Sequence, residues 1–286
     1  MPKLRYRIVN VFAEAPLAGN PLAVVEDGSG LDDATMQALA LQFNLSETTY
    51  LLPATVPGAS ARVRIFTPVA ELPFAGHPTL GTAHVLRALR GGDAVDLEMK
   101  AGVIPVRAQD DRWTLQANAP KQRAPQATRE QFAGMLGLDA ADVLPGALWV
   151  DTGTEQLVVP LTTPEAVTRC QPRADLLARY SVGSARQGLA YVWARVDAAT
   201  VRVRFFATKH GGIYEDCGTG SACANLGGFL IATGAALPFA LTVEQGDQVG
   251  RPCRLGLRVD DQRRIFVSGR VIEIGHGEIV LPDHAA

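Results

Sequence analysis

A short pattern that occurs twice constrains the fold of this chain more than any other feature of its sequence. Residues 62–67 and residues 202–207 both begin Arg-Val-Arg and alternate in the manner of a half-buried strand. Each is followed by a loop that carries an acid, Glu71 or Glu215, and then by a turn of small residues and an apolar segment long enough for a helix. A helix without a polar face must be enclosed. The pattern favours two domains related by duplication, each built around a central helix; chance similarity of two short strand-helix units is the alternative.

The start of the second predicted helix carries the residues best suited to chemistry. Residues 218–221 (Gly-Thr-Gly-Ser) form a turn of small residues that opens the helix, and Glu215, Asp216 and Cys217 stand immediately before it. The first N–H groups of a helix have no partner within it and, with the helix dipole, favour a carboxylate or phosphate. We expect an anion site here, close to groups that can transfer protons, with the two helix starts free to face one cleft. An ordinary loop closing onto a buried helix would have a similar sequence.

Composition and charge exclude several classes of protein. The chain has 286 residues, of which 47% are hydrophobic and 20% charged, as in a soluble globular protein of one large or two medium domains. A formal net charge of -2 gives no basic surface for a nucleic acid. No apolar run approaches the roughly 18 residues of a membrane span, and no signal peptide is evident. We therefore expect a cytoplasmic protein without nucleic-acid or membrane partners.

The cysteines and histidines do not form a recognisable metal or redox motif. Cys170, Cys217, Cys223 and Cys253 show no Cys-x-x-Cys spacing, so free thiols are expected. Without a carboxylate or third ligand nearby in sequence, His77 is better placed for a core or helix-start role than for binding a metal. The sequence also lacks a Walker loop and a dinucleotide-binding glycine motif, so no cofactor is expected.

The order of the predicted elements sets the domain boundary. A helix over 34–43 leads to a strand around 50–52, and Glu47 lies at their junction, where a glutamate is usually a solvated loop charge. The strands after the first central helix form a meander that ends near Asn118. Residues 120–125 are polar, contain two prolines, and have the character of a linker. Two further strands are expected at 263–268 and within 271–281, the last returning to the first domain.

Five motifs, in the same order along the chain, resemble those of the phenazine-biosynthesis PhzF family. They are PLAGNPLAV (16–24), NLSETT (44–49), FTP with ELPFAGHPTLG (66–68 and 71–81), ED with TGSA (215–216 and 219–222), and EQG with GRP (244–246 and 250–252). The resemblance implies the α+β fold of diaminopimelate epimerase. In that fold, two similar domains each wrap a curved, mostly antiparallel sheet or barrel around a central helix, with the active site between them. The first domain would be residues 1–118, completed by a strand at about 275–286, and the second would be residues 119–274.

The resemblance also implies an activity and a set of site residues. The best-known member of the family is a homodimeric, cofactor-independent isomerase of trans-2,3-dihydro-3-hydroxyanthranilate. Matched by motif, Glu47 would be the general acid/base that removes and returns a proton, while His77 and Asp216 would hold and polarise the substrate. Ser221 would also hold the substrate, and Gly76 and Gly220 would offer backbone N–H groups. The neighbouring Cys217, Gly218 and Thr219 complete the substrate-binding residues that we predict. A single base suits this chemistry, because the proton moves between two carbons of one unsaturated acid.

One motif departs from the family pattern. Cys217-Gly218 stands where the family usually has Pro-Ala, and a Cys-Gly-Thr-Gly sequence is how diaminopimelate epimerase presents a catalytic thiol. A thiol at a helix start can have a lowered pKa, so an amino-acid epimerase or racemase that uses Cys217 is an alternative function. We expect Cys217 to be a small filler residue rather than a base or nucleophile. A third possibility is a catalytically silent protein that binds a small carboxylate.

Overall fold

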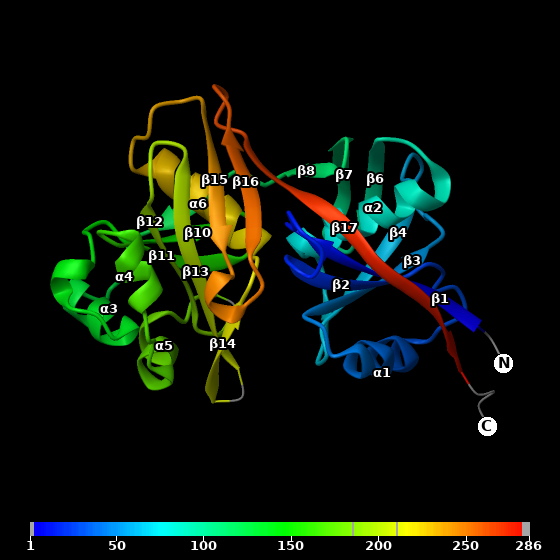
Figure 1. The fold of residues 1–286 in the computed structure, drawn as a ribbon, viewed down its shortest axis with the longest axis horizontal. Helices are drawn as coiled ribbons and strands as arrows, with labels where there is room; N and C mark the ends of the chain where they lie inside the picture. Colours follow the sequence, from blue (N-terminus) through cyan, green and yellow to red (C-terminus); the bar gives the residue numbers. More distant parts are fainter. Residues whose placement is uncertain (1–2, 185, 210, 282–286) are drawn as a thin grey trace. The chain divides into compact units, whose positions relative to one another are not determined.

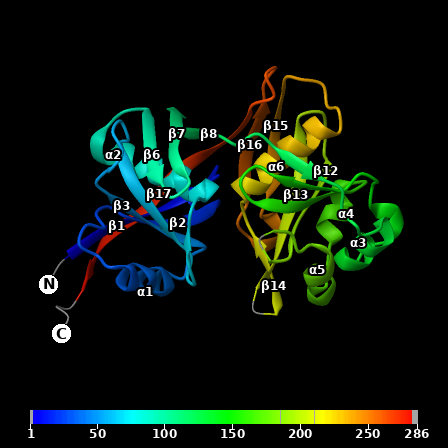
Figure 2. The same cartoon turned by 180° about the vertical axis from the view of Figure 1, so that it is seen from behind.

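The computed structural model describes residues 3–184, 186–209 and 211–281, and the chain forms two compact units. The first unit contains the chain up to Leu115 together with the residues from Ser268 onward, and the second runs from Gln116 to Val267 (Figures 1 and 2). Both units are α+β, which confirms the predicted fold class.

The first unit is a closed ring of strands around one helix. Its elements are β1 (Lys3–Val11), β2 (Asn20–Val25), α1 (Asp33–Phe43), β3 (Glu47–Leu52), β4 (Ala61–Phe66), β5 (Glu71–Leu72), α2 (Gly76–Arg90), β6 (Ala94–Met99), β7 (Gly102–Gln109), β8 (Arg112–Gln116) and most of β17 (Ile265–Val280). Most neighbouring strands are antiparallel, whereas β2 with β3 and β4 with β6 are parallel. β17 pairs with both β1 and β8 and so closes the ring around α2.

The second unit repeats this order of strands. Its elements are β9 (Lys121–Arg123), α3 (Arg129–Leu136), the 3-10 turn η1 (Ala140–Asp142), β10 (Leu148–Asp151), β11 (Glu155–Pro160), α4 (Pro164–Arg169), α5 (Ala174–Tyr180), β12 (Leu189–Arg195), β13 (Thr200–Lys209), β14 (Gly212–Asp216), α6 (Gly220–Ala232), β15 (Phe239–Gln245), η2 (Asp247–Val249) and β16 (Cys253–Val259). β11 with β12 and β13 with β15 are the parallel pairs. α6 packs against β9, β10, β11 and β16, while α4 packs on β12 and β13.

The repeat extends to individual side chains. Phe66 of β4 pairs with Glu71 of β5, and Phe206 of β13 pairs with Glu215 of β14. In each unit the arginine two residues before the phenylalanine donates two hydrogen bonds to that glutamate, with donor-acceptor distances of 2.7 to 2.9 Å. These arginines are Arg64 and Arg204. Agreement in both register and ion pairing supports duplication over chance similarity.

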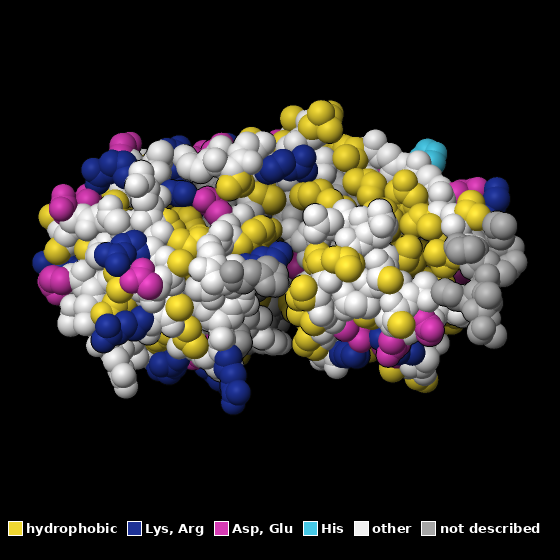
Figure 3. All heavy atoms as spheres, turned by 90° about the horizontal axis from the view of Figure 1, so that it is seen from below, with side chains coloured by type: hydrophobic (Ala, Val, Ile, Leu, Met, Phe, Trp, Pro, Cys, Tyr) yellow, Lys and Arg dark blue, Asp and Glu magenta, His cyan; other side chains and the backbone are white. Residues whose placement is uncertain are grey.

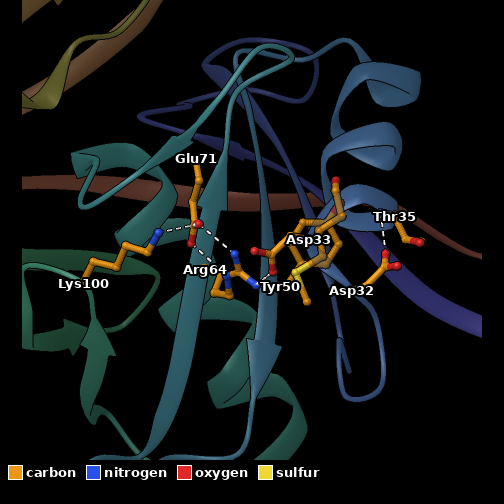
Figure 4. A network of polar contacts seen from close by, with 8 residues as sticks. Asp32, Asp33, Thr35, Tyr50, Arg64, Glu71 and Lys100 are labelled. Carbon is orange, nitrogen blue, oxygen red and sulfur yellow. Dashed lines mark hydrogen bonds and ion pairs between the residues drawn. The ribbon is translucent and has the colours of Figure 1, made fainter.

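Figure 4 shows the ion pair of the first unit. Arg64 reaches Glu71 and also Asp33 at the start of α1, and Lys100 binds the same glutamate. The Arg64 guanidinium lowers the pKa of Glu71. The network therefore fastens α1, β4 and β5 together. Glu71 and Glu215 were expected in loops, but both lie in short strands, where their arginine partners hold them.

Glycines allow both central helices to pack closely against the strands. A Cβ at Gly81 of α2 would lie 2.6 Å from Cδ2 of Leu22. A Cβ at Gly228 of α6 would lie 2.7 Å from Cβ of Pro120 and 2.9 Å from Cγ1 of Val150. All three distances are well below ordinary van der Waals contact, so a larger residue fits only if these neighbouring side chains shift.

Replacing Gly228 with alanine is expected to lower the free energy of unfolding by about 1 to 3 kcal/mol, because the ring of Pro120 and the branched side chain of Val150 must shift. The matched control is Gly134→Ala in α3, where the nearest atom to the new Cβ would be 4.0 Å away. There the higher helix propensity of alanine should leave stability unchanged or slightly increased. Urea denaturation of both variants tests the packing, and equal stabilities would contradict it.

Two details of the sequence prediction were wrong. Residues 120–125 are not a simple linker, because β9 lies within them and pairs with β10, and Pro120 packs on α6. The last two predicted strands are one continuous strand, β17. Gly269, between the two predicted strands, does not interrupt β17. A Cβ at this position would overlap the ring of Phe12, so glycine is required for the strand to pass close to that ring.

On the face shown in Figure 3, acidic and basic side chains are interspersed, and neither sign dominates. None of the helices in the described residues is both long and apolar enough to cross a membrane.

Candidate functional site

Glu47 is fixed at the first position of β3. α1 ends at Asn44 in the left-handed conformation, with φ of 52°, so the chain turns from helix to strand within three residues. Glu47 then pairs with Leu22 of the parallel strand β2. Its side chain is only 16% exposed, which is not the environment of a solvated loop charge. Glu47 is therefore not the solvated loop charge that its place in the sequence predicts.

His77 lies beside Glu47, at the second residue of α2. Its Nε2 is 3.4 Å from Oε2 of Glu47, and its Nδ1 is 3.4 Å from Nδ2 of Asn20. Burial lowers the pKa of His77 to about 3, so the imidazole is neutral and the contact with Glu47 is not an ion pair. The ring hydrogen is on Nε2, facing Glu47, in the tautomer in which the Asn20 amide donates to Nδ1, and on Nδ1 in the tautomer in which the ring donates to the Pro21 carbonyl. Nε2 makes no hydrogen bond within the described chain.

The neutral state of His77 predicts a pH dependence of stability. Its folded pKa of about 3 lies below the ordinary value of 6.5, so the unfolded chain binds the proton more readily between these values. The stability from neutral His77 is present above pH 6.5 and is lost as the pH falls toward 3, by about 2 kcal/mol between pH 7 and pH 5. Unfolding free energies measured at both pH values should show a smaller change in His77→Gln. An identical change in the two proteins would show that His77 is not buried as a neutral group.

In the second unit, Asp216 lies at the end of β14 and is bound to the residue that precedes α6. The hydroxyl of Thr219 donates to Oδ2 of Asp216 at 2.6 Å. The buried amide of Gln245 joins both: its Nε2 donates to the Asp216 carbonyl at 2.8 Å and to the Thr219 hydroxyl at 2.9 Å, while its Oε1 accepts from the Thr219 N–H at 3.2 Å. These bonds fix the turn containing Cys217 and Gly218. Gln245 belongs to the EQG motif at 244–246, but its role could not be predicted from the sequence.

Neither central helix is capped by its own N-cap side chain. Asp32, Thr128 and Thr163 cap α1, α3 and α4 by accepting a hydrogen bond from a first-turn N–H. Ala75 cannot do so for α2, and Thr219 does not do so for α6, because its hydroxyl is directed to Asp216. An N-cap bond is worth about 0.5 to 2 kcal/mol, so giving it up at a threonine is unusual. Thr219 accepts no hydrogen bond from the first turn of α6, which includes Gly220 and Ser221; α5 likewise has no side-chain cap.

A buried chain of side-chain amides supports Ser221. Nε2 of Gln156 donates to the Ser221 hydroxyl at 3.0 Å, and Nδ2 of Asn225 donates to Oε1 of Gln156 at 2.8 Å. Oδ1 of Asn225 accepts from both the N–H and the hydroxyl of Thr152. The Ser221 hydroxyl is thus held by residues of β11 and α6. Gln156 gave no sequence signal, because its partner lies 65 residues away.

Cys217 is buried beside a second thiol. A hydrogen bond with Cys217, followed by burial, raises the pKa of Cys253. Gly246 lies against the same turn, with φ of 85°, and a Cβ there would be 2.5 Å from the Cys217 carbonyl oxygen. All four cysteines are free and buried. Among the residues that the structure describes, no three histidine, cysteine or acidic side chains are grouped so that they could hold a metal ion.

The two acids predicted for the site, Glu47 and Asp216, do not occupy equivalent positions in the two repeats. Strand register matches Glu47 of the first unit with Leu189 of the second, and Asp216 of the second with Leu72 of the first. The structure thus brings Glu47, Gly76 and His77 together in the first unit. The predicted residues of the second unit, Asp216, Cys217, Gly218, Thr219, Gly220 and Ser221, gather around the start of α6.

The fold and site define a duplicated α+β protein with polar and acidic groups at the start of each central helix. The family model described as phenazine biosynthesis-like protein, PhzC-PhzF, matches residues 9–277. The chain therefore belongs to the PhzC-PhzF family.

Individual proteins show the same relationship. The chain is 40% identical to an uncharacterized isomerase of Pasteurella multocida, in an alignment that covers 97% of this chain and 94% of that protein. It is 35% identical to the trans-2,3-dihydro-3-hydroxyanthranilate isomerase of Pseudomonas aeruginosa, over 90% of each chain. The crystal structure of a PhzF-family phenazine biosynthesis protein from Bacillus anthracis has a TM-score of 0.85 and 23% identity, covering 98% of this chain and 100% of that one, and so shares the fold.

Proposed function

We propose that this protein is an isomerase that moves a proton within a small unsaturated or cyclic carboxylic acid, using Glu47 as the general acid/base. The observation that carries the proposal is the largely buried carboxylate of Glu47, 3.4 Å from a neutral imidazole whose Nε2 makes no hydrogen bond within the described chain. The name of the Pseudomonas aeruginosa relative supports trans-2,3-dihydro-3-hydroxyanthranilate, or an acid similar to it, as substrate.

The proposed step is a proton transfer that leaves the substrate's composition unchanged. The Glu47 carboxylate takes a proton from one carbon, the electron pair shifts through the adjacent double bond, and the carboxylic acid returns a proton to the carbon at the far end. The N–H of neutral His77 stabilises the charge that develops on the substrate. The substrate carboxylate is assigned to the start of α6, where an anion is favoured by the helix dipole.

Turnover in heavy water tests this function. The purified chain is incubated with trans-2,3-dihydro-3-hydroxyanthranilate in D2O, and product and carbon-bound deuterium are followed by NMR and mass spectrometry. We expect isomerised product that carries deuterium at the carbon that receives the proton. Neither product nor exchange with this acid would contradict the proposal as it applies to that substrate.

The same assay separates the epimerase alternative. If Cys217 were the base, Cys217→Ser would lose exchange and Glu47→Gln would keep it. Cys217 is buried against Cys253 and Gly246, which favours a packing role. We therefore expect Cys217→Ser to retain turnover within a few fold.

A further inference from the structure

Tyr191 of β12 has a buried hydroxyl for which the described chain supplies no hydrogen-bond partner. The residue is 0% exposed. Tyr50 provides the contrast: it is buried to the same degree, but its hydroxyl donates to the Met36 carbonyl at 2.6 Å. An unpaired buried hydroxyl costs about 1 to 3 kcal/mol, so it calls for a partner that the chain itself does not provide.

Strand register places Tyr191 on the face of the sheet that carries Asp216. Tyr191 pairs with Phe205 of β13, and Phe205 pairs with Asp216 of β14, so the three side chains form a row on one face. The rings of Tyr191 and Phe205 are in contact, with centroids 6.3 Å apart. The alternate residues Ala190 and Val192 belong to the hydrophobic core on the opposite face.

The hydroxyl also lies near the start of α6. Asp216 and Cys223, which is in the first turn of α6, both act electrostatically on the Tyr191 phenol. Burial raises the pKa of Tyr191 well above its ordinary value, so the group stays protonated and can donate a hydrogen bond. Trp193, two residues further along β12, also has an N–H with no hydrogen-bond partner among the described residues, but its ring contacts Phe229 near the C-terminal end of α6, away from the helix start.

We propose that Tyr191 is a substrate-binding residue whose hydroxyl donates a hydrogen bond to a hydroxyl group of the substrate beside Asp216. A second carboxylate would be repelled by Asp216, whereas a hydroxyl can accept from the phenol and donate to the aspartate. The substrate class is therefore a hydroxylated acid, with its carboxylate at the start of α6. This inference rests on the proposed function and adds the group that selects the substrate.

The test pairs two variants with two ligands. 3-Hydroxyanthranilate and anthranilate differ only by the hydroxyl, and their affinities are measured by calorimetry on the full chain, on Tyr191→Phe and on Tyr50→Phe. We expect Tyr191→Phe to weaken 3-hydroxyanthranilate by about tenfold, the effect of one lost hydrogen bond, and to change anthranilate by less than twofold. Tyr50→Phe should leave both affinities unchanged.

Thermal unfolding of the ligand-free proteins gives a second readout. Tyr50→Phe loses a buried hydrogen bond and should melt about 3 °C lower, whereas Tyr191→Phe removes an unpaired group and should melt at the same or a higher temperature. A lower melting temperature of Tyr191→Phe with unchanged affinities would show that a bound water satisfies the hydroxyl and would overturn the inference. Equal losses for both ligands, or no binding of either by the unsubstituted chain, would overturn it as well. The heavy-water assay is independent, so turnover with unchanged Tyr191→Phe affinities rejects this inference alone.

Discussion

Replacing Glu47 with glutamine is expected to lower the rate of isomerisation and of deuterium exchange by about a thousandfold or more. Glutamine keeps the size and polarity of the side chain but cannot take or return a proton. His77, 3.4 Å from the Glu47 carboxylate, is neutral, so the substitution does not break an ion pair with it. Single-turnover rates with trans-2,3-dihydro-3-hydroxyanthranilate, compared with the unsubstituted chain, measure the effect.

Two controls define what the loss would mean. Glu47→Asp retains a carboxylate but withdraws it by one methylene, so it should recover part of the rate. Binding of 3-hydroxyanthranilate to Glu47→Gln should remain within a few fold, since the proposed anchors lie at the start of α6. A glutamine variant that turns over at the normal rate would remove Glu47 from the chemistry and reopen the role of Cys217.

Replacing Arg204 with alanine is expected to cause the largest loss of stability, about 3 to 5 kcal/mol in the free energy of unfolding. Arg204 is 8% exposed, and its guanidinium makes two hydrogen bonds to Glu215. Its Nη1 also donates to the carbonyls of Val167, Thr168 and Cys170 at the end of α4. Its removal would leave a mostly buried carboxylate and several carbonyls without their donor.

The repeat supplies the matched control for Arg204. Arg64→Ala breaks the equivalent pair with Glu71, but Lys100 still binds that glutamate, so the expected loss is smaller, about 1 to 3 kcal/mol. Arg204→Lys should recover little, because a single ammonium cannot replace the bidentate fork and the carbonyl contacts together. Equal destabilisation by Arg204→Ala and Arg64→Ala, measured by urea unfolding, would contradict this account.

The duplicated plan could be predicted because hydrophobic periodicity reports directly on strands and enclosed helices. The strand Arg62-Val-Arg-Ile-Phe, the helix before Gly91, and the turn before α6 all form where the pattern places them. The role of the repeated acids, Glu71 and Glu215, could not be predicted from hydrophobic periodicity. Glu71 and Glu215 form ion pairs with Arg64 and Arg204, and this depends on which face of the sheet each residue occupies. The recurrence of an arginine followed by a glutamate in both repeats was the feature of the sequence that could have predicted these ion pairs.

The site shows a similar division. Asp216 and the Gly-Thr-Gly-Ser turn were proposed as site residues from local chemistry, whereas Glu47 was proposed only through the family resemblance. Gln156, Asn225 and Tyr191 were not predicted, because their importance comes from partners or neighbours distant in sequence. A buried amide or phenol looks like any other core residue until strand register shows what it faces.

The position of β17 has a consequence for synthesis of the protein. The second unit is one uninterrupted stretch of chain, and it can complete its core as soon as it leaves the ribosome. The first unit begins earlier but lacks the strand between β1 and β8 until the final residues are translated. A nascent chain stalled before Ser268 would therefore expose the open edges of β1 and β8, which makes this half the one more dependent on chaperones.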